Sequence, residues 1–393
     1  MYDIRVEDFI DVKSNKSPFD LNDLIHICKR VNNSKREYLF VNRYQGKHIS
    51  ESPYNITSLF DSFVAEVKAN INPFEKVVVV GFAETATGIA EYLTYKLSLD
   101  KEYKNTVVYH LQTSRENYSD CPKLFTFDEE HSHAVNQYLY CKNFLPKYDK
   151  VLFVEDEITT GNTILNFINE FKKINPDCNY AVSSILNWQN ECNRKTFDAQ
   201  GIDRICLVEG EIKSDLPALS MVENKGAVDY ISHFYHGINA TPFIYASIVP
   251  NSRKGVDPHS FRRYIDKVQD KVTVGLCSYV NRDETVMVIG TEEFMFYPLM
   301  AARDLEQSLG CKVKYRATTR SPIASCSADG YIIKDAITLP SAYDKDRQTY
   351  LYNMNDDYSK IVVISDVNMT LEFKQAITEF AVKNSKKVYF ITV

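Results

Sequence analysis

The order of apolar and polar positions along the chain alternates between two kinds of segment. Short runs rich in β-branched residues, at 77–81 and 285–290, end in glycine and have the continuous apolar pattern of strands that are buried on both faces. The segment 58–69 instead places its apolar residues at the three- and four-residue spacing of an amphipathic helix. Strands that alternate with helices predict an α/β fold with a parallel, doubly wound sheet.

This pattern predicts two successive series of elements. A long polar loop is expected over 113–140, and the strand at 180–186 is expected to close the first series. In that series the expected strands are 38–41, 77–81, 106–111, 151–154 and 180–186, and the expected helices are 58–69, 87–97 and 162–174. In the second series the expected strands are 285–290, 313–317, 361–364 and 387–392, and the expected helices are 298–309 and 371–382.

The two series match each other in spacing and in local sequence. The distance along the chain from the glycine that ends the first buried strand to the acid that ends a later strand is nearly the same in both. In both series the next strand leads into a Thr-hydroxyl-Arg triplet, at 113–115 and at 318–320. We therefore expect an internal duplication with domains at 1–213 and 214–393, although two unrelated doubly wound domains would share part of this rhythm.

Composition agrees with a two-domain globular protein. The chain has 393 residues, of which 44% are hydrophobic and 25% charged, and this length is more than one ordinary core accommodates. The net charge is -6 and no long block of lysine or arginine occurs, which argues against a nucleic-acid partner.

The nine cysteines form no Cys-x-x-Cys pair, so we expect reduced thiols. With neither a leader-like start nor a long apolar stretch, we expect a cytoplasmic protein without a membrane partner.

The segment 151–163, with the sequence VLFVEDEITTGNT, joins an apolar strand to a short hydroxyl-rich loop and a helix start. Unpaired backbone N–H groups at a helix start favour a phosphate group. Gly161 allows the backbone to approach the anion closely. The side chains that would add donors are those of Thr159, Thr160, Asn162 and Thr163.

The two acids at the end of this strand, Glu155 and Asp156, suit the rest of such a ligand. Their carboxylates would accept hydrogen bonds from two vicinal ribose hydroxyls and from water bound to Mg²⁺. The segment therefore predicts a site for a 5-phosphorylated ribose. The alternative is an ordinary strand–helix turn with a capping threonine.

These residues closely resemble the motif with which type I phosphoribosyltransferases bind phosphoribosyl pyrophosphate (PRPP). The resemblance implies a catalytic role for Glu155 and Asp156, which would also hold Mg²⁺ indirectly, through water or PRPP. Glu157 departs from the motif, where an apolar or small residue is commoner, and its carboxylate would weaken anion binding or help to hold a cation. The remaining PRPP-binding residues would be Glu157, Ile158, Thr159, Thr160, Gly161, Asn162 and Thr163.

The resemblance assigns further roles to two loops. The loop after the first buried strand would hold pyrophosphate, although it lacks the glycine and basic residue often seen there, and a plain strand–helix connection is the alternative. Its residues are Phe82, Ala83, Glu84 and Thr85. The loop 113–140 would close over the reaction, with Arg115 on pyrophosphate oxygens. His131 or His133 would contact substrate or act as a general acid, with a solvated loop as the alternative.

Near the N-terminus, Arg36, Lys47 and His48 would form a hood over the acceptor, although an ordinary surface turn is the alternative. Together with Thr-Arg-Ser-Pro at 319–322, the whole pattern resembles a bacterial family of phosphoribosyltransferase-like proteins. That family carries a C-terminal TRSP domain named for this motif and is associated with tellurium-resistance and stress gene clusters. The resemblance covers most of the chain and implies a nucleoside-like product made with partner biosynthetic enzymes.

The second unit has no Thr-Thr-Gly-x-Thr loop, so it is not expected to bind PRPP in the usual way. It would bind another ligand or complete the first site. Its candidate residues are Thr291, Glu292, Arg320 and Ser321.

The function expected from the residues and the resemblance is transfer of a phosphoribosyl group from PRPP to a base-like acceptor, with Mg²⁺ as cofactor and release of pyrophosphate. A PRPP-sensing regulator or non-catalytic assembly protein on the same fold is the alternative, and a third interpretation runs the chemistry in reverse. The acceptor is left open, as is a homodimer.

Overall fold

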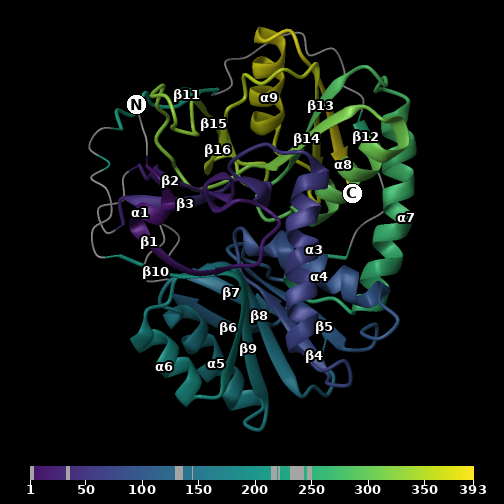
Figure 1. Ribbon diagram of the computed structural model, residues 1–393. Helices are drawn as coiled ribbons and strands as arrows, with labels where there is room; N and C mark the ends of the chain where they lie inside the picture. Colours follow the sequence, from purple (N-terminus) through teal and green to yellow (C-terminus); the bar gives the residue numbers. More distant parts are fainter. Residues whose placement is uncertain are drawn as a thin grey trace.

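The valine run that predicted a buried strand forms β4 (Val77–Gly81), the centre of the larger of two main sheets in the computed structural model (Figure 1). The structure describes residues 4–31, 36–128, 136–143, 145–213, 219, 222–230, 243–245 and 250–393. The order of the eight strands is β1-β10-β9-β8-β4-β5-β7-β6, and the five from β10 to β5 are parallel. The other strands of this sheet are β1 (Ile10–Asn15), β5 (Val107–Ser114), β6 (Lys123–Asp128), β7 (Asn136–Tyr140), β8 (Lys150–Ile158), β9 (Asn179–Asn187) and β10 (Ile202–Ile212).

Helices cover both faces of this sheet, which confirms the doubly wound fold. On one face lie α3 (Pro53–Asn70) and α4 (Ala86–Leu99), and on the other α5 (Asn162–Ile174) and α6 (Glu191–Ala199). Apolar residues of α5 recur at helical spacing and are buried against the strands, as the sequence pattern requires. The N-terminal elements are α1 (Val6–Phe9), α2 (Leu21–Leu24), the hairpin of β2 (Ile25–Lys29) and β3 (Tyr38–Asn42), and η1 (Arg43–Gln45).

The second unit is built on a smaller parallel sheet with the order β12-β18-β17-β13-β14. One face packs on α9 (Leu371–Lys383), and the other faces α7 (Pro258–Cys277) and α8 (Phe296–Leu309). Its strands are β12 (Phe243–Tyr245), β13 (Thr285–Gly290), β14 (Lys312–Ala317), β17 (Lys360–Ser365) and β18 (Lys387–Thr392). A third sheet joins β11 (Val228–Asp229), β15 (Ala336–Pro340) and β16 (Gln348–Tyr352), and η3 (Ser252–Lys254) precedes α7.

The central strands follow the same order in both units. The order β9-β8-β4-β5 in the first corresponds to β18-β17-β13-β14 in the second. Each unit also has an extra strand pair at the same place in the chain: β6–β7 lies between β5 and β8, and β15–β16 lies between β14 and β17. This agreement is what a duplication requires, and the duplication stays our proposal. So does the domain boundary at 213, because residues 214–218 lie outside the described part of the chain.

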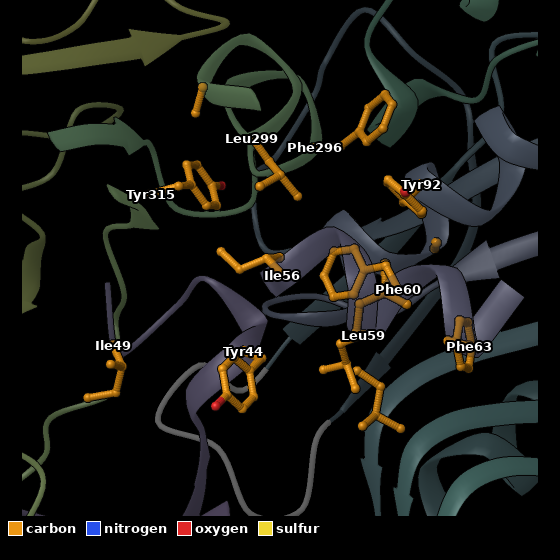
Figure 2. Packing of buried hydrophobic residues seen from close by; sticks show 14 of the residues in the cluster. Tyr44, Ile49, Ile56, Leu59, Phe60, Phe63, Tyr92, Phe296, Leu299 and Tyr315 are labelled. Atoms are coloured by element: carbon orange, nitrogen blue, oxygen red, sulfur yellow. The ribbon is translucent and has the colours of Figure 1, made fainter. Parts of the chain in front are cut away.

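A shared hydrophobic core joins the two units. It forms where α3 and α4 of the first unit meet α7 and α8 of the second (Figure 2). The Phe60 ring packs edge-on against Tyr92, whose ring in turn packs edge-on against Phe296 of α8. Burial of large side chains on both sides fixes the orientation of the units, and so the loops at the carboxyl ends of β4 and β5 face those of β13 and β14.

Three sequence predictions are wrong in extent. The strand expected at 151–154 continues to Ile158, because β9 pairs alongside as far as Asn187, so the acids lie within the strand and not just beyond its last residue. The segment 113–140, which was expected to be a polar loop, contains β6 and β7. These antiparallel strands lie at the edge of the sheet, where one face of each strand can be polar, so they lack the continuous apolar pattern of the central strands. The strand at 180–186 does not close the series, since α6 and β10 follow and β1 pairs outside β10.

Within the described part of the chain, no helix is both long enough and apolar enough to cross a lipid bilayer.

Candidate active site

The turn between β8 and α5 presents an open helix start. Gly161 has φ 82°, a left-handed conformation, and a Cβ atom there would lie 2.5 Å from Cζ of Phe197. The N-cap residue Gly161 has no side chain to cap the helix, and the N–H of Asn162 donates to Oγ1 of Thr160 at 3.3 Å. Thr160 and Asn162 are exposed, and among the described residues no hydrogen-bond partner engages the next two amides, those of Thr163 and Ile164, at the open start of the helix.

A cavity of about 500 Å³ lies over this turn. The described residues that were predicted for the site and line it are Arg36, His48, Phe82, Ala83, Glu84, Thr85, Arg115, Glu155, Asp156, Glu157, Ile158, Thr159, Thr160, Gly161, Asn162, Thr163, Arg320 and Ser321. Residues distant in sequence and from both units thus meet at one hollow. His131 and His133 lie outside the described residues, and their role stays a prediction.

A larger and more open hollow, of about 1220 Å³, lies beside Tyr148 and Asp149 at the amino ends of the strands. None of the described residues predicted for the site lines it. In parallel α/β sheets ligands bind at the carboxyl ends of the strands, and so we assign the candidate site to the smaller cavity.

Glu157, the departure from the motif, is half-buried and pairs with Arg36, whose Nη2 lies 2.7 Å from its Oε1. Burial raises the pKa of Glu157, and the Arg36 guanidinium opposes part of this rise. The Arg36 guanidinium also lies 4.8 Å from the centre of the Tyr38 ring. The pair joins the β2–β3 hairpin to the end of β8 beside the cavity.

Glu84 of the predicted pyrophosphate loop is the centre of a buried ionic cluster. Its Oε1 lies 2.7 Å from Nζ of Lys47 and its Oε2 lies 3.4 Å from Nη1 of Arg115. The backbone N–H of Arg320 donates to the same carboxylate at 3.1 Å. Burial alone would raise the pKa of Glu84, but Lys47, Arg115 and Arg320 outweigh it and lower the pKa to about 2. Cationic and N–H groups from both units therefore hold the ionised carboxylate of Glu84 at the cavity wall.

Lys47 does not occupy the position that was predicted for it. Its side chain is fully buried, pairs with Glu84 and donates to the backbone carbonyl of Glu292 at 2.7 Å, and it is not among the residues that line the cavity. The reason is the buried carboxylate, which a cation must neutralise. Its neighbour His48 does line the cavity.

His48 is a buried imidazole, and among the described residues neither ring nitrogen has a hydrogen-bond partner. Burial lowers the pKa of His48 to about 3, and the charge of Lys47 lowers it further in the same direction. The neutral ring therefore keeps one donor and one acceptor at the cavity wall.

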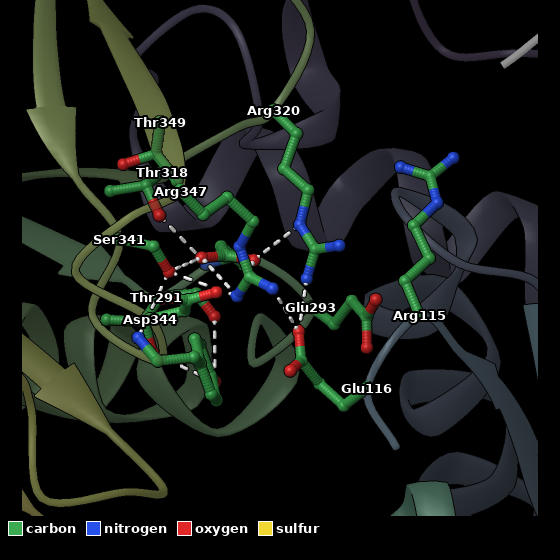
Figure 3. Close-up of polar contacts among 12 residues, drawn as sticks. Arg115, Glu116, Thr291, Glu293, Thr318, Arg320, Ser341, Asp344, Arg347 and Thr349 are labelled. Carbon is green, nitrogen blue, oxygen red and sulfur yellow. Dashed lines mark hydrogen bonds and ion pairs between the residues drawn. The ribbon is translucent and has the colours of Figure 1, made fainter. Parts of the chain in front are cut away.

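Two arginines of the second unit line the cavity from the opposite side, and Figure 3 shows them converging on Glu116 of the first unit. Nε of Arg320 lies 2.6 Å from Oε2 of Glu292, and its Nη2 lies 2.5 Å from Oε1 of Glu116. Nη2 of Arg347 lies 3.1 Å from Glu292, and its Nη1 lies 2.8 Å from Glu116. Burial lowers the pKa of Arg320, but Glu292 and neighbouring carboxylates outweigh it and raise the pKa.

The other candidates of the second unit lie behind these arginines. Glu292 is buried and also accepts a hydrogen bond from Ser341. Thr291 is buried and its hydroxyl donates to Ser365 at 2.9 Å. Neither lines the cavity, so their place favours support of the wall and not direct ligand contact.

Sequence reasoning did not single out Arg30, Leu39, Phe40, Arg347 or Gln348, which also line the cavity. Arg347 has no motif around it, and the pairing of β16 with β15 brings it to the site. Arg30 and Phe40 lie within six residues of Arg36, which was predicted for the hood. This nearness to Arg36 was the only sequence signal that could have indicated them.

Comparison with known families decides the assignment. A family model for phosphoribosyl transferases matches residues 24–210, and a model for the TRSP domain, which follows such a transferase at its C-terminal side, matches residues 251–380. Residues 24–210 belong to the phosphoribosyltransferase family, and residues 251–380 belong to the TRSP family that accompanies it. The two matches place the turn, Glu84 and Arg115 in the transferase domain, and Arg320 and Arg347 in the TRSP domain.

Solved phosphoribosyltransferases are similar to part of this chain. Adenine phosphoribosyltransferase from Rhodothermus marinus is 12% identical over 48% of this chain and 96% of that one, with a TM-score of 0.33. The Saccharomyces cerevisiae enzyme is 15% identical over 47% and 94%, with a TM-score of 0.30. Orotate phosphoribosyltransferase from Aeropyrum pernix is 14% identical over 46% and 86%, with a TM-score of 0.30. A comparison with curated proteins finds no match.

The carboxylates of the site fit a magnesium ion that arrives with a phosphorylated substrate. Glu155 and Asp156 line the cavity beside the open turn, and Mg²⁺ is commonly held by one or two carboxylates together with substrate phosphates. Among the described residues, no group of three or more His, Cys, Asp or Glu side chains could hold a metal ion by itself. The donor set therefore suits a shared ion and not one bound by the protein alone.

Proposed function

We propose that this phosphoribosyltransferase binds PRPP in the cavity over the β8–α5 turn and transfers the phosphoribosyl group to a base-like acceptor. The observation that carries the proposal is the open start of α5 beside Glu155 and Asp156 in one cavity. Unpaired amides and the positive end of the helix dipole stabilise a phosphate at this position. The 5-phosphate would lie on the amides of residues 160–163.

The ribose would then extend toward the carboxylates at the end of β8. Vicinal hydroxyls at carbons 2 and 3 would donate to Glu155 and Asp156, which accept only when ionised. Bound Mg²⁺, held by these carboxylates through water or PRPP, would supply stabilisation of the negative charge on the leaving pyrophosphate.

Pyrophosphate would lie against the loop 82–85 and Arg115. The Glu84 carboxylate is already engaged by Lys47, Arg115 and the backbone of Arg320, and the N–H of Phe82 donates to the carbonyl of Val154. The loop would therefore offer the anion the backbone N–H groups of Glu84 and Thr85 and not this side chain. Ala83 N–H is held by Thr113 Oγ1 at 2.7 Å, which orders the loop before substrate arrives.

The acceptor would enter between the hairpin and the second unit. Leu39 and Phe40 give this part of the cavity an apolar surface, which suits a flat base. The unpaired ring nitrogens of His48 would recognise polar edges of that base. A base-like acceptor with both features fits the site better than an apolar alcohol.

In the reaction the bond between carbon 1 of the ribose and the pyrophosphate oxygen breaks, and the electron pair leaves with pyrophosphate. A nitrogen of the acceptor forms the new bond to carbon 1 from the opposite face and loses a proton to solvent. The protein contributes orientation of both substrates, charge stabilisation of the leaving group and exclusion of water, since hydrolysis of PRPP competes.

The test is an assay of pyrophosphate release with PRPP, Mg²⁺ and a panel of nitrogenous bases, with the product identified by mass spectrometry. We expect release that depends on one class of base and falls at least roughly 100-fold in Asp156→Asn. Binding of PRPP without turnover with any base would favour a regulator, and absence of PRPP binding would remove the proposal.

Three context assignments stay part of the proposal. They are a cytoplasmic location, a homodimer, and partner enzymes that act on a nucleoside-like product in tellurium or stress responses. No nucleic-acid partner is proposed.

A further inference from the structure

The cavity is closed on one side by the second unit, whose TRSP motif reaches it directly. Arg320 follows β14, and Arg347 immediately precedes β16. Both guanidinium groups line the cavity whose opposite wall carries the β8–α5 turn. A domain that lacks its own phosphate loop thus places two fixed cations at the phosphate site of its neighbour.

The two arginines are held from behind in defined orientations. Glu292 is 1% exposed and binds both of them, with distances of 2.6 Å to Arg320 and 3.1 Å to Arg347. The backbone N–H of Glu292 donates to Thr318 at 2.9 Å, and Ser341 donates to its carboxylate. A buried carboxylate that is itself anchored keeps both guanidinium planes in place before a ligand arrives.

Each guanidinium keeps donor capacity toward the cavity. Arg320 uses Nε and Nη2 for Glu292 and Glu116, and its Nη1 has no hydrogen-bond partner among the residues that the structure describes. Arg347 uses Nη2 for Glu292 and Ser341 and Nη1 for Glu116, which leaves one hydrogen of Nη1 for a ligand, while its Nε is closed to solvent. Side-chain exposures of 13% for Arg320 and 21% for Arg347 leave part of each group open to the cavity.

The charges of the first unit explain why these cations are needed. Its wall carries three consecutive acids, at 155–157, and the charges of Arg36 and Arg30 both act on Glu157. Arg115 is shared with the buried Glu84. A substrate that carries a 5-phosphate and a pyrophosphate needs more positive charge than this wall supplies.

We propose that Arg320 and Arg347 bind the pyrophosphate group of PRPP, so that the TRSP domain completes the active site of the transferase domain. This inference rests on the proposed function and names the part of the substrate that the second unit recognises. The cross-contacts between the units are reciprocal, since Arg320 N–H donates to Glu84 at 3.1 Å and Ser114 donates to Glu293 at 3.3 Å.

The experiment is isothermal titration of the full chain with three probes, each with Mg²⁺: PRPP, pyrophosphate and ribose 5-phosphate. For Arg347→Gln we expect affinity for PRPP and pyrophosphate to fall roughly 10- to 100-fold, the range for loss of a charged hydrogen bond. Affinity for ribose 5-phosphate stays within about two-fold, because that probe lacks the group the arginine binds.

Arg347→Lys guards against a folding defect, because lysine keeps the charge beside Glu292 while losing the bidentate geometry. We expect for it a smaller loss in the same two affinities. The matched control is Arg263→Gln on α7, whose side chain donates to Ser260 of the same helix. This variant leaves all three affinities unchanged.

The outcomes separate the two proposals. If the wild type binds neither PRPP nor ribose 5-phosphate, the proposed function fails. If the wild type binds PRPP and Arg347→Gln and Arg347→Lys bind pyrophosphate as tightly as the wild type, the role of the second unit alone is overturned. An equal loss of ribose 5-phosphate affinity in both variants would also overturn it.

Discussion

Nζ of Lys47 lies 2.7 Å from Oε1 of Glu84, and both side chains are closed to solvent. The pair connects the N-terminal segment to the loop after β4, where Glu84 lines the candidate site and Lys47 does not. Removing one partner of a buried ion pair leaves an uncompensated charge, which costs about 3 kcal/mol or more. We therefore expect Lys47→Met to lower the free energy of unfolding by about 3 kcal/mol, measured by urea denaturation.

The double variant Lys47→Met with Glu84→Gln is the control for this prediction. Because it removes both charges, we expect it to be less destabilised than the sum of the two single variants. Additive losses would mean that the two residues stabilise the fold independently.

Gly161 provides a test of the phosphate turn with a matched control elsewhere. Gly161 and Gly201 both have left-handed backbone, at φ 82° and φ 65°, but only a Cβ at Gly161 would meet a neighbour, the Phe197 ring. An L-residue in this conformation costs about 1 to 2 kcal/mol at either position. We expect Gly161→Ala to weaken ribose 5-phosphate binding at least roughly 10-fold, whereas Gly201→Ala changes stability alone. Equal binding by both variants would move the phosphate away from this turn.

Glu91 of α4 gives the fold a pH dependence. Burial raises the pKa of Glu91 to about 7 from 4.5, although hydrogen bonding from Ser252 and the charge of Arg253 oppose the rise. The folded protein therefore binds more protons than the unfolded chain between pH 4.5 and 7, and the stability from the neutral carboxyl is lost as pH rises through this window.

We expect Glu91→Gln to remove this loss, because glutamine does not titrate. The free energy of unfolding of the wild type relative to Glu91→Gln should fall by roughly 2 to 3 kcal/mol between pH 5 and pH 8. Urea denaturation at both pH values measures it, and a constant difference would show that Glu91 is ionised throughout.

Replacing Glu116 should change pyrophosphate affinity in the opposite direction to replacing an arginine. Its Oε1 binds both Arg320 and Arg347, while Glu292 holds the same two groups from behind. Removing the Glu116 charge should leave the arginines in place and make the site more positive. We expect Glu116→Gln to bind pyrophosphate roughly 2- to 10-fold more tightly.

Glu102→Gln is the control for that measurement, since Glu102 is exposed beyond the far end of α4. We expect its pyrophosphate affinity to equal that of the wild type at the same salt concentration. Weaker binding by Glu116→Gln would mean that this carboxylate orients the arginines and does not compete with the ligand.

The sequence was most informative where one local pattern determines the structure. The valine run at 77–81 and the run at 285–290 are strands over the predicted residues, because a continuous apolar segment that ends in glycine has few other stable arrangements. The start of α5 at Asn162 was also predictable, since Gly161 allows the left-handed turn before it.

The parts that sequence did not predict depend on partners distant along the chain. Lys47 was expected in a hood over the acceptor, but it is buried against the carboxylate of Glu84. Arg347 stands in a polar stretch and reaches the cavity because β16 pairs with β15. The extension of β8 through Glu155 is likewise a result of pairing with β9. Such arrangements follow from tertiary packing, which residue types alone do not specify.

The most direct test of the central claim is a crystal structure of the protein with Mg²⁺ and PRPP. We expect the 5-phosphate within hydrogen-bond distance of backbone amides in residues 160–163, with the ribose hydroxyls on Glu155 and Asp156. A phosphate bound at another place, or carboxylates that point away from the ribose, would contradict the account.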